Sequence, residues 1–196
     1  MNIDKLQKNL IKCGYKVHVF NTSKEAVEYL SEEIKDTSVG IGGSLTVKEI
    51  GLYDELIKNN EVYWHWITSG DDTKKLANEA EVYITGANAI SEDGEIVNID
   101  GCGNRLAGQL GGGKRLYIVV GINKLCKDLQ SAVKRARNIA AVNNCKRLNR
   151  KTPCTVDGKC HDCNSKERIC CALLISLRPI IGIDASVVII NENIGG

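Results

Sequence analysis

The chain has 196 residues, of which 43% are hydrophobic, enough for one domain with a substantial core. Its 26 basic and 24 acidic residues give a formal net charge of +2, which does not favour a nucleic-acid partner. The N-terminus lacks the apolar stretch of a secretory signal, and no apolar run approaches the roughly 18 residues that cross a membrane. We therefore expect a cytoplasmic protein without nucleic-acid or membrane partners, whose thiols stay reduced.

The N-terminal half alternates between helical and strand patterns. Apolar residues recur at helical spacing in residues 4–12, 22–34, 45–57 and 71–80. Strand patterns cover residues 15–20, 38–41, 61–66 and 81–85. Within the third helix, Thr46 and Glu49 match a capping box, which predicts a helix start there.

The C-terminal half continues the alternation. Residues 89–90 and 95–99 predict a hairpin across Asp93-Gly94, and residues 116–120 form a continuous apolar strand typical of a parallel sheet. A helix over 128–142, a short helix over 172–177 and a last strand over 186–190 complete the pattern. The whole predicts one α/β domain, residues 1–196, with a mainly parallel sheet flanked by helices.

Two glycine-rich turns follow strands. Residues 39–44 read Val-Gly-Ile-Gly-Gly-Ser, and residues 100–105 read Asp-Gly-Cys-Gly-Asn-Arg. Glycines let the backbone approach a ligand, and strand ends of a parallel sheet share one crevice. Tight structural turns, and a surface ion pair for Arg105, are the alternatives. The candidate ligand-binding residues are Gly42, Gly43, Ser44, Asn88, Asn104 and Arg105.

Cys102 and His65 are two further candidates for reactive side chains. Cys102 stands between two glycines with no base beside it in sequence, so we expect it to be non-essential. His65 stands between two tryptophans, where a structural role is favoured over a catalytic one.

The cysteines concentrate near the C-terminus, in a predicted metal-binding loop over residues 145–171. The spacing Cys154-x5-Cys160-x2-Cys163-x6-Cys170 can bring four thiols together as a disulfide pair, a zinc site or an iron–sulfur cluster. A reducing compartment disfavours disulfides, and a loop of unliganded thiols is the remaining alternative. Cys145, Cys171 and His161 are substitute ligands.

An iron–sulfur cluster, [4Fe–4S], is favoured over zinc at this loop. Zinc sites usually combine two tight ligand pairs, and the loop has one, Cys160-x2-Cys163. Cluster ligation tolerates wider spacing. Lys159, Lys166 and Arg168 lie close enough in sequence to offset the negative charge of a four-thiolate cluster.

Several segments together resemble the LUD (lactate utilisation) domain family, formerly DUF162. The resemblance rests on residues 39–44, 49–51, 85–90, 98–101 and 103–105. The C-terminal signature of the small single-domain members is matched by residues 146–148, 152–154 and 168–170. The resemblance implies the α/β fold shared by ribose-5-phosphate isomerase, glucosamine-6-phosphate isomerase and CoA transferases.

The resemblance also has implications for the function. Sugar-phosphate isomerases carry a catalytic Asp where this chain has Asn88, and an amide cannot shuttle a proton. The family implies oxidation of lactate or another small 2-hydroxy acid beside iron–sulfur subunits. A zinc-stapled domain that binds or transforms a phosphorylated or CoA-linked metabolite is the alternative, and a non-catalytic sensor or assembly partner is another. The partner is expected to be a small anionic metabolite, with other redox subunits or a homo-oligomer left open.

Overall fold

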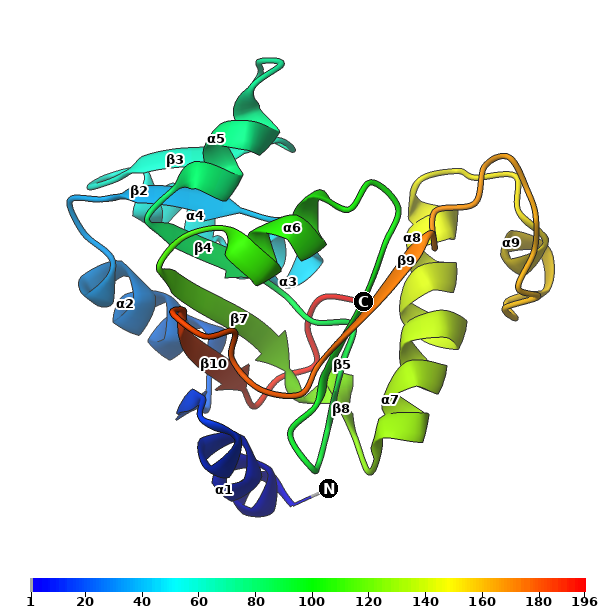
Figure 1. The fold of residues 1–196 in the computed structure, drawn as a ribbon, viewed down its shortest axis with the longest axis horizontal. Coiled ribbons are helices and arrows are strands. Elements are labelled where there is room, and N and C mark those ends of the chain that lie inside the picture. Colours follow the sequence, from blue (N-terminus) through cyan, green and yellow to red (C-terminus); the bar gives the residue numbers. More distant parts are fainter. Residues whose placement is uncertain (1) are drawn as a thin grey trace.

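A six-stranded parallel sheet forms the centre of the computed structural model, which describes residues 2–196 (Figure 1). The strand order is β1-β10-β7-β4-β2-β3, and every neighbouring pair is parallel. The strands are β1 (Lys16–Phe20), β2 (Ser38–Ile41), β3 (Glu61–Trp64), β4 (Val82–Thr85), β7 (Arg115–Gly121) and β10 (Asp184–Ile190). The predicted α/β fold with a mainly parallel sheet is confirmed.

Helices cover both faces of this sheet. One face buries α2 (Ser23–Glu33), α3 (Leu45–Glu49) and α4 (Leu52–Leu56) against side chains such as Ile84 and Val119. The other face buries α1 (Ile3–Cys13), α5 (Thr73–Glu79) and α6 (Asn104–Gly111) against the alternate side chains, including Tyr83 and Ile118. Successive side chains of a strand point to opposite faces of the sheet. Because helices cover both faces, the continuous apolar strands bury the side chains of both faces.

A smaller sheet lies beside the first, with strand order β8-β5-β6-β9. Its strands are β5 (Ala89–Ser91), β6 (Ile96–Asp100), β8 (Leu125–Cys126) and β9 (Ala172–Ser176). The predicted hairpin is confirmed: β5 and β6 pair antiparallel, and Gly94 takes φ +102° in the turn. No helix among residues 2–196 has the length and apolarity of a membrane span.

One long helical run packs on the smaller sheet and carries the cysteine segment. It comprises α7 (Leu129–Arg135), a π-helical turn η2 (Ala136–Ala140) and α8 (Ala141–Arg147). A short helix, α9 (Pro153–Asp157), follows, and Figure 1 shows it on the far side of α8 from the central sheet. A π-helical turn inside a helix frequently marks a functional site.

Three local predictions were wrong. The helix over 45–57 is divided into α3 and α4 by Gly51 at φ +70°, and its cap is the Ser44 side chain, which accepts from the Val47 N–H at 3.2 Å. Residues 172–177 do not form a helix, because residues 172–176 pair antiparallel with β6 as strand β9. The glycine-rich stretch after residue 100 contains α6, a helix that no sequence pattern predicted.

Candidate functional site

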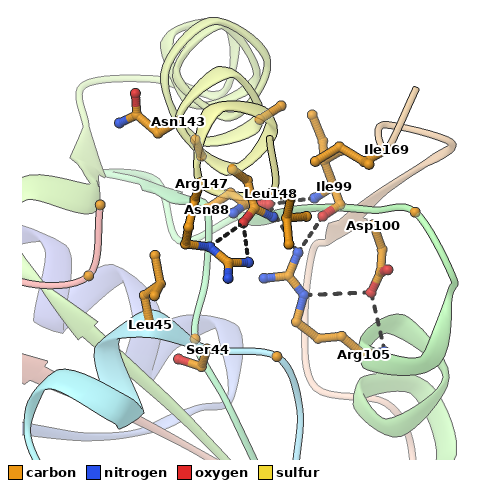
Figure 2. A pocket seen from close by; sticks show the side chains of 18 of the residues that line it. Ser44, Leu45, Asn88, Ile99, Asp100, Arg105, Asn143, Arg147, Leu148 and Ile169 are labelled. Atoms are coloured by element: carbon orange, nitrogen blue, oxygen red, sulfur yellow. Dashed lines mark hydrogen bonds and ion pairs between the residues drawn. The ribbon is translucent and has the colours of Figure 1, made fainter. Parts of the chain in front are cut away.

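A cavity of about 240 Å³ lies at the carboxyl edge of the central sheet. The segments that follow β2, β3, β4, β7 and β10 supply its floor and one wall. The opposite wall comes from the end of β6, the start of α6, α8 and Ile169 of the cysteine segment (Figure 2). This is where parallel α/β sheets usually bind ligands.

The structure brings most of the predicted ligand-binding residues to this cavity. Five of the six line it: Gly43, Ser44, Asn88, Asn104 and Arg105. Gly42 does not line the cavity but lies directly behind Arg105, since a Cβ added at Gly42 would stand 3.1 Å from the Arg105 Cγ. A Cβ added at Gly43 would stand 3.1 Å from the Trp66 ring, and one at Gly86 would stand 2.7 Å from the Ser44 Oγ, so these glycines let the cavity walls approach each other.

The Arg105 side chain is held in place by Asn88 and by residues at the end of β6. Its Nε lies 3.7 Å from the Asp100 Oδ2, and its Nη2 donates to the Asn88 Oδ1 (3.3 Å) and to the Ile99 carbonyl. The side chain is only 12% exposed, and this burial lowers the pKa of the Arg105 guanidinium. Among residues 2–196, Nη1 has no hydrogen-bond partner, so this donor remains for a ligand.

The Asp100 carboxylate binds the backbone N–H groups of the second glycine-rich turn. Its carboxylate accepts the backbone N–H groups of Cys102 (3.0 Å), Gly103 (3.1 Å) and Arg105 (3.2 Å). Asp100 therefore caps α6 and occupies the donors that an anion would otherwise use. The anion-binding capacity of this wall lies in the Arg105 side chain and not in the glycine backbone.

Asn88 is part of the same framework. Its Oδ1 accepts the Ile99 N–H at 2.6 Å and its own N–H donates to the Asn98 Oδ1 at 3.0 Å. The buried Arg135 of α7 donates to the Asn88 carbonyl at 2.5 Å, which ties the helical run to the sheet edge. Asn88 positions Arg105 and the cavity wall, and it has no proton to exchange at neutral pH.

Three further cations line the cavity, and motif reasoning did not identify them as ligands: Arg147, Lys124 and the exposed Arg150. Arg147 of α8 donates from Nε and Nη2 to the Asn144 Oδ1 at 3.0 and 2.6 Å, and its guanidinium lies 5.0 Å from the centre of the Trp66 ring. Figure 2 shows it pointing toward Arg105 across the cavity. The only sequence signal for Arg147 was its place in the family-like segment 146–148.

Lys124 is the second of these cations and lies in a short 3₁₀ turn, η1 (Ile122–Lys124), after β7. It is only 4% exposed, and its Nζ donates to the Gly196 carbonyl at 2.9 Å. Burial, helped by the charge of Arg135, lowers the pKa of Lys124 to about 8. With Arg105, Arg147 and Arg150, it makes four basic side chains among the lining residues, against one acidic side chain, that of Asp100.

His65 and Cys102 also line the cavity. Burial lowers the pKa of His65, with the charge of Lys74 adding to the effect, so its imidazole is mostly neutral near pH 7 and can accept a proton. Cys102 is exposed at the cavity mouth. His65 thus lies close to the ligand space, although the sequence pattern favoured a structural role.

The cysteine segment reaches the same wall. The Cys171 N–H donates to the Asp100 carbonyl at 3.0 Å, and Ile169 lines the cavity. The predicted metal ligands Cys154, Cys160, Cys163 and Cys170 are all half-buried. Across residues 2–196, no three His, Cys, Asp or Glu side chains are grouped closely enough to hold a metal ion. The predicted ligand set therefore does not form a ready-made coordination shell.

The chain was compared with known proteins and structures. Residues 3–190 match the family described as the LUD domain. No curated protein matches the sequence. The crystal structure of a DUF162 family protein from Deinococcus radiodurans aligns with a TM-score of 0.58 at 12% identity, covering 97% of this chain and 96% of that one.

A second structure, eIF2B beta from Chaetomium thermophilum, aligns with a TM-score of 0.33 at 17% identity, over 65% of this chain and 44% of that one. The match to the Deinococcus protein supports the fold over nearly the full length of both chains. Since the family match also spans nearly all residues, this chain belongs to the LUD domain family.

Proposed function

We propose that this LUD-domain protein binds a small organic anion in the cavity and acts in the oxidation of lactate or another small 2-hydroxy acid. One observation carries the proposal: the Arg105 and Arg147 guanidinium groups, which come from α6 and α8, point toward each other in one cavity (Figure 2). A carboxylate between two such groups can accept charge-assisted hydrogen bonds from both. Lys124 adds a third positive charge to the floor.

The neighbouring groups suit a hydroxy acid. With the carboxylate held by the arginines, the neutral His65 could accept the hydroxyl proton. Oxidation to the 2-oxo acid releases two electrons and two protons, so the reaction needs an electron acceptor. A partner redox subunit or an iron–sulfur cluster in the cysteine segment is the acceptor that the proposal requires.

A second candidate function is binding or transformation of a phosphorylated or CoA-linked metabolite, with zinc in the cysteine segment. The cavity volume of about 240 Å³ favours it, because a three-carbon acid would leave space unfilled. Phosphate would also accept hydrogen bonds from Arg105, Arg147 and Lys124. Calorimetric titration with lactate, glycolate, pyruvate, phosphate and ribose 5-phosphate separates the candidates, since the preferred class should bind at least tenfold more tightly than the other.

Replacing Arg147 with Gln should weaken anion binding about tenfold, or about 1.4 kcal/mol. The estimate is at the low end for a charged hydrogen bond because Arg147 lies at the exposed side of the cavity. The matched control is Lys146→Gln, which removes one charge from the adjacent residue of α8 that does not line the cavity. Equal affinities in the two variants, measured by calorimetry, would reject Arg147 as a ligand-binding residue.

Anion affinity should fall as the pH rises through about 8. The Lys124 amine is mostly protonated at about pH 7 and mostly neutral at about pH 9, because its pKa is lowered to about 8. An anion binds the protonated form better, so its dissociation constant should rise several-fold over this interval. His65 titrates below the interval, because its pKa is lowered. Lys124→Met should flatten the profile; a slope unchanged by this substitution assigns the titration to another group.

A further inference from the structure

The segment that follows β10, residues 191–196, reaches the cavity; it is drawn in red in Figure 1. The Glu192 carbonyl accepts the Ile122 N–H of η1 at 3.1 Å, which anchors the segment beside the end of β7. Beyond this anchor, Gly195 and Gly196 line the cavity. A bound anion would therefore meet the backbone of this segment as part of the cavity floor.

The segment packs closely on α3. Gly195 is buried with φ +70°, and a Cβ added there would stand 2.0 Å from the Thr46 Oγ1. The Ile194 N–H donates to the Asn123 Oδ1 at 3.3 Å, which fixes the chain just before this contact. Because only glycine combines this backbone conformation with so close an approach, the segment has a defined position beside α3.

The Glu49 carboxylate holds the segment in that position. Its Oε2 accepts the Gly195 N–H at 2.5 Å. The sequence pattern paired Glu49 with Thr46 in a capping box, but the Ser44 side chain caps α3 and Glu49 is the last residue of that helix. The carboxylate is therefore available to the segment, and a hydrogen bond to a carboxylate is stronger than one between neutral groups.

The Gly196 carbonyl in turn holds a cation of the cavity. It accepts the Lys124 Nζ at 2.9 Å and the Arg135 Nη2 at 3.4 Å, and only Lys124 of these two lines the cavity. An ammonium group has three N–H donors. Among residues 2–196, the Lys124 Nζ has no other hydrogen-bond partner. The bond to the segment therefore sets the direction of the ammonium and leaves its other donors for a ligand.

We propose that Glu49 is a positioning residue of the anion site, which acts through residues 195–196 to direct the Lys124 ammonium toward a bound carboxylate or phosphate. The inference rests on the proposed function for the class of ligand. Glu49 does not line the cavity, so it acts through the segment and not by touching the ligand.

The charge of Glu49 affects Lys124 as well. Burial lowers the pKa of Lys124, and the charges of Arg135 and Arg105 add to that effect. The Glu49 carboxylate opposes it, so removing this charge should let Lys124 lose its proton at a lower pH. A carboxylate close to the cavity also repels anions. At a pH where Lys124 stays protonated, weaker anion binding after removal of Glu49 therefore indicates lost positioning and not lost charge.

The variants Glu49→Gln and Glu49→Ala test the role by calorimetric titration with inorganic phosphate at about pH 6, where Lys124 is protonated. Both remove the charge, but Gln keeps an acceptor for the Gly195 N–H. We expect Gln to bind phosphate at least as tightly as wild type and Ala to bind about fivefold more weakly, the scale of one hydrogen bond. The matched control is Asp54→Ala, an exposed carboxylate of α4 that does not line the cavity, which should match wild type. Wild-type affinity in Glu49→Ala, or equal losses in Gln and Ala, overturns the proposal.

A second measurement needs no ligand. Nuclear magnetic resonance follows hydrogen exchange of the Gly195 amide and titration of the Lys124 side chain. We expect exchange to be about tenfold faster or more in Glu49→Ala, with protection retained in Glu49→Gln. Lys124 should titrate at lower pH in both variants.

The two measurements separate the inference from the proposed function. Unchanged Gly195 exchange in Glu49→Ala overturns the positioning role, even where wild type binds phosphate or lactate. If wild type binds neither anion, the proposed function fails, and exchange together with titration still decides whether Glu49 positions Lys124.

Discussion

Asp100→Ala should lower the free energy of unfolding by about 3 kcal/mol, the scale for removing one member of a buried ion pair. The substitution leaves the 12%-exposed guanidinium of Arg105 without its carboxylate. It also removes the acceptor for three backbone N–H groups at the start of α6. Both losses act on the same cavity wall, so anion binding should weaken together with stability.

Urea denaturation followed by circular dichroism measures this change. Asp100→Asn is the informative companion, because its amide oxygen can still cap α6 while the charge opposite Arg105 is lost. We expect Asn to recover part of the stability. If Asn and Ala unfold at the same urea concentration, capping contributes little and the ion pair dominates; if neither differs from wild type, Asp100 does not organise the wall.

The sheet could be predicted from the sequence because its signal is local. The apolar strands ending at Ile41, Thr85 and Val120 are each bounded by glycine or polar residues, and burial on both faces leaves them uniformly apolar. The glycine turn over 39–44 follows one of these strands, so its place at the carboxyl edge follows from parallel topology. That reasoning placed Ser44 and Arg105 near one another.

Prediction from the sequence failed where the local structure depends on contacts with residues far away in the chain. Residues 172–177 have no alternation, and only the edge of β6 makes part of them a strand. The α6 helix was hidden by its glycines, which serve packing: a Cβ at Gly108 would stand 2.1 Å from the Tyr83 ring. Because glycine has a low helix propensity, Gly108 argues against a helix in the sequence. The close contact with Tyr83 explains why glycine is needed at this position.

The cationic side chains were missed for the same reason. Lys124 follows β7 and Arg147 ends α8, and nothing in their immediate sequence indicates that they share a cavity with Arg105.

Gly40→Ala should destabilise the protein by about 3 kcal/mol or more, at the upper end of the cost of overpacking. Gly40 is buried in the middle of β2, between β3 and β4, and a Cβ there would stand 1.8 Å from the Ala77 carbonyl oxygen of α5. That neighbour is backbone and cannot rotate away, so either α5 or the strand must shift. The shift would extend toward the adjacent turn that ends in Ser44.

The matched control is Gly111→Ala in α6, where nothing lies within 4 Å of the added Cβ. This change should be neutral or stabilise by about 0.5–1 kcal/mol, because alanine costs less backbone entropy than glycine in a helix. Urea midpoints at unchanged slope measure both effects. Equal midpoints for the two variants would show that α5 does not approach β2 as closely as the structure has it. A large loss confined to Gly40→Ala follows directly from backbone contact, since no polar group or charge changes in either variant.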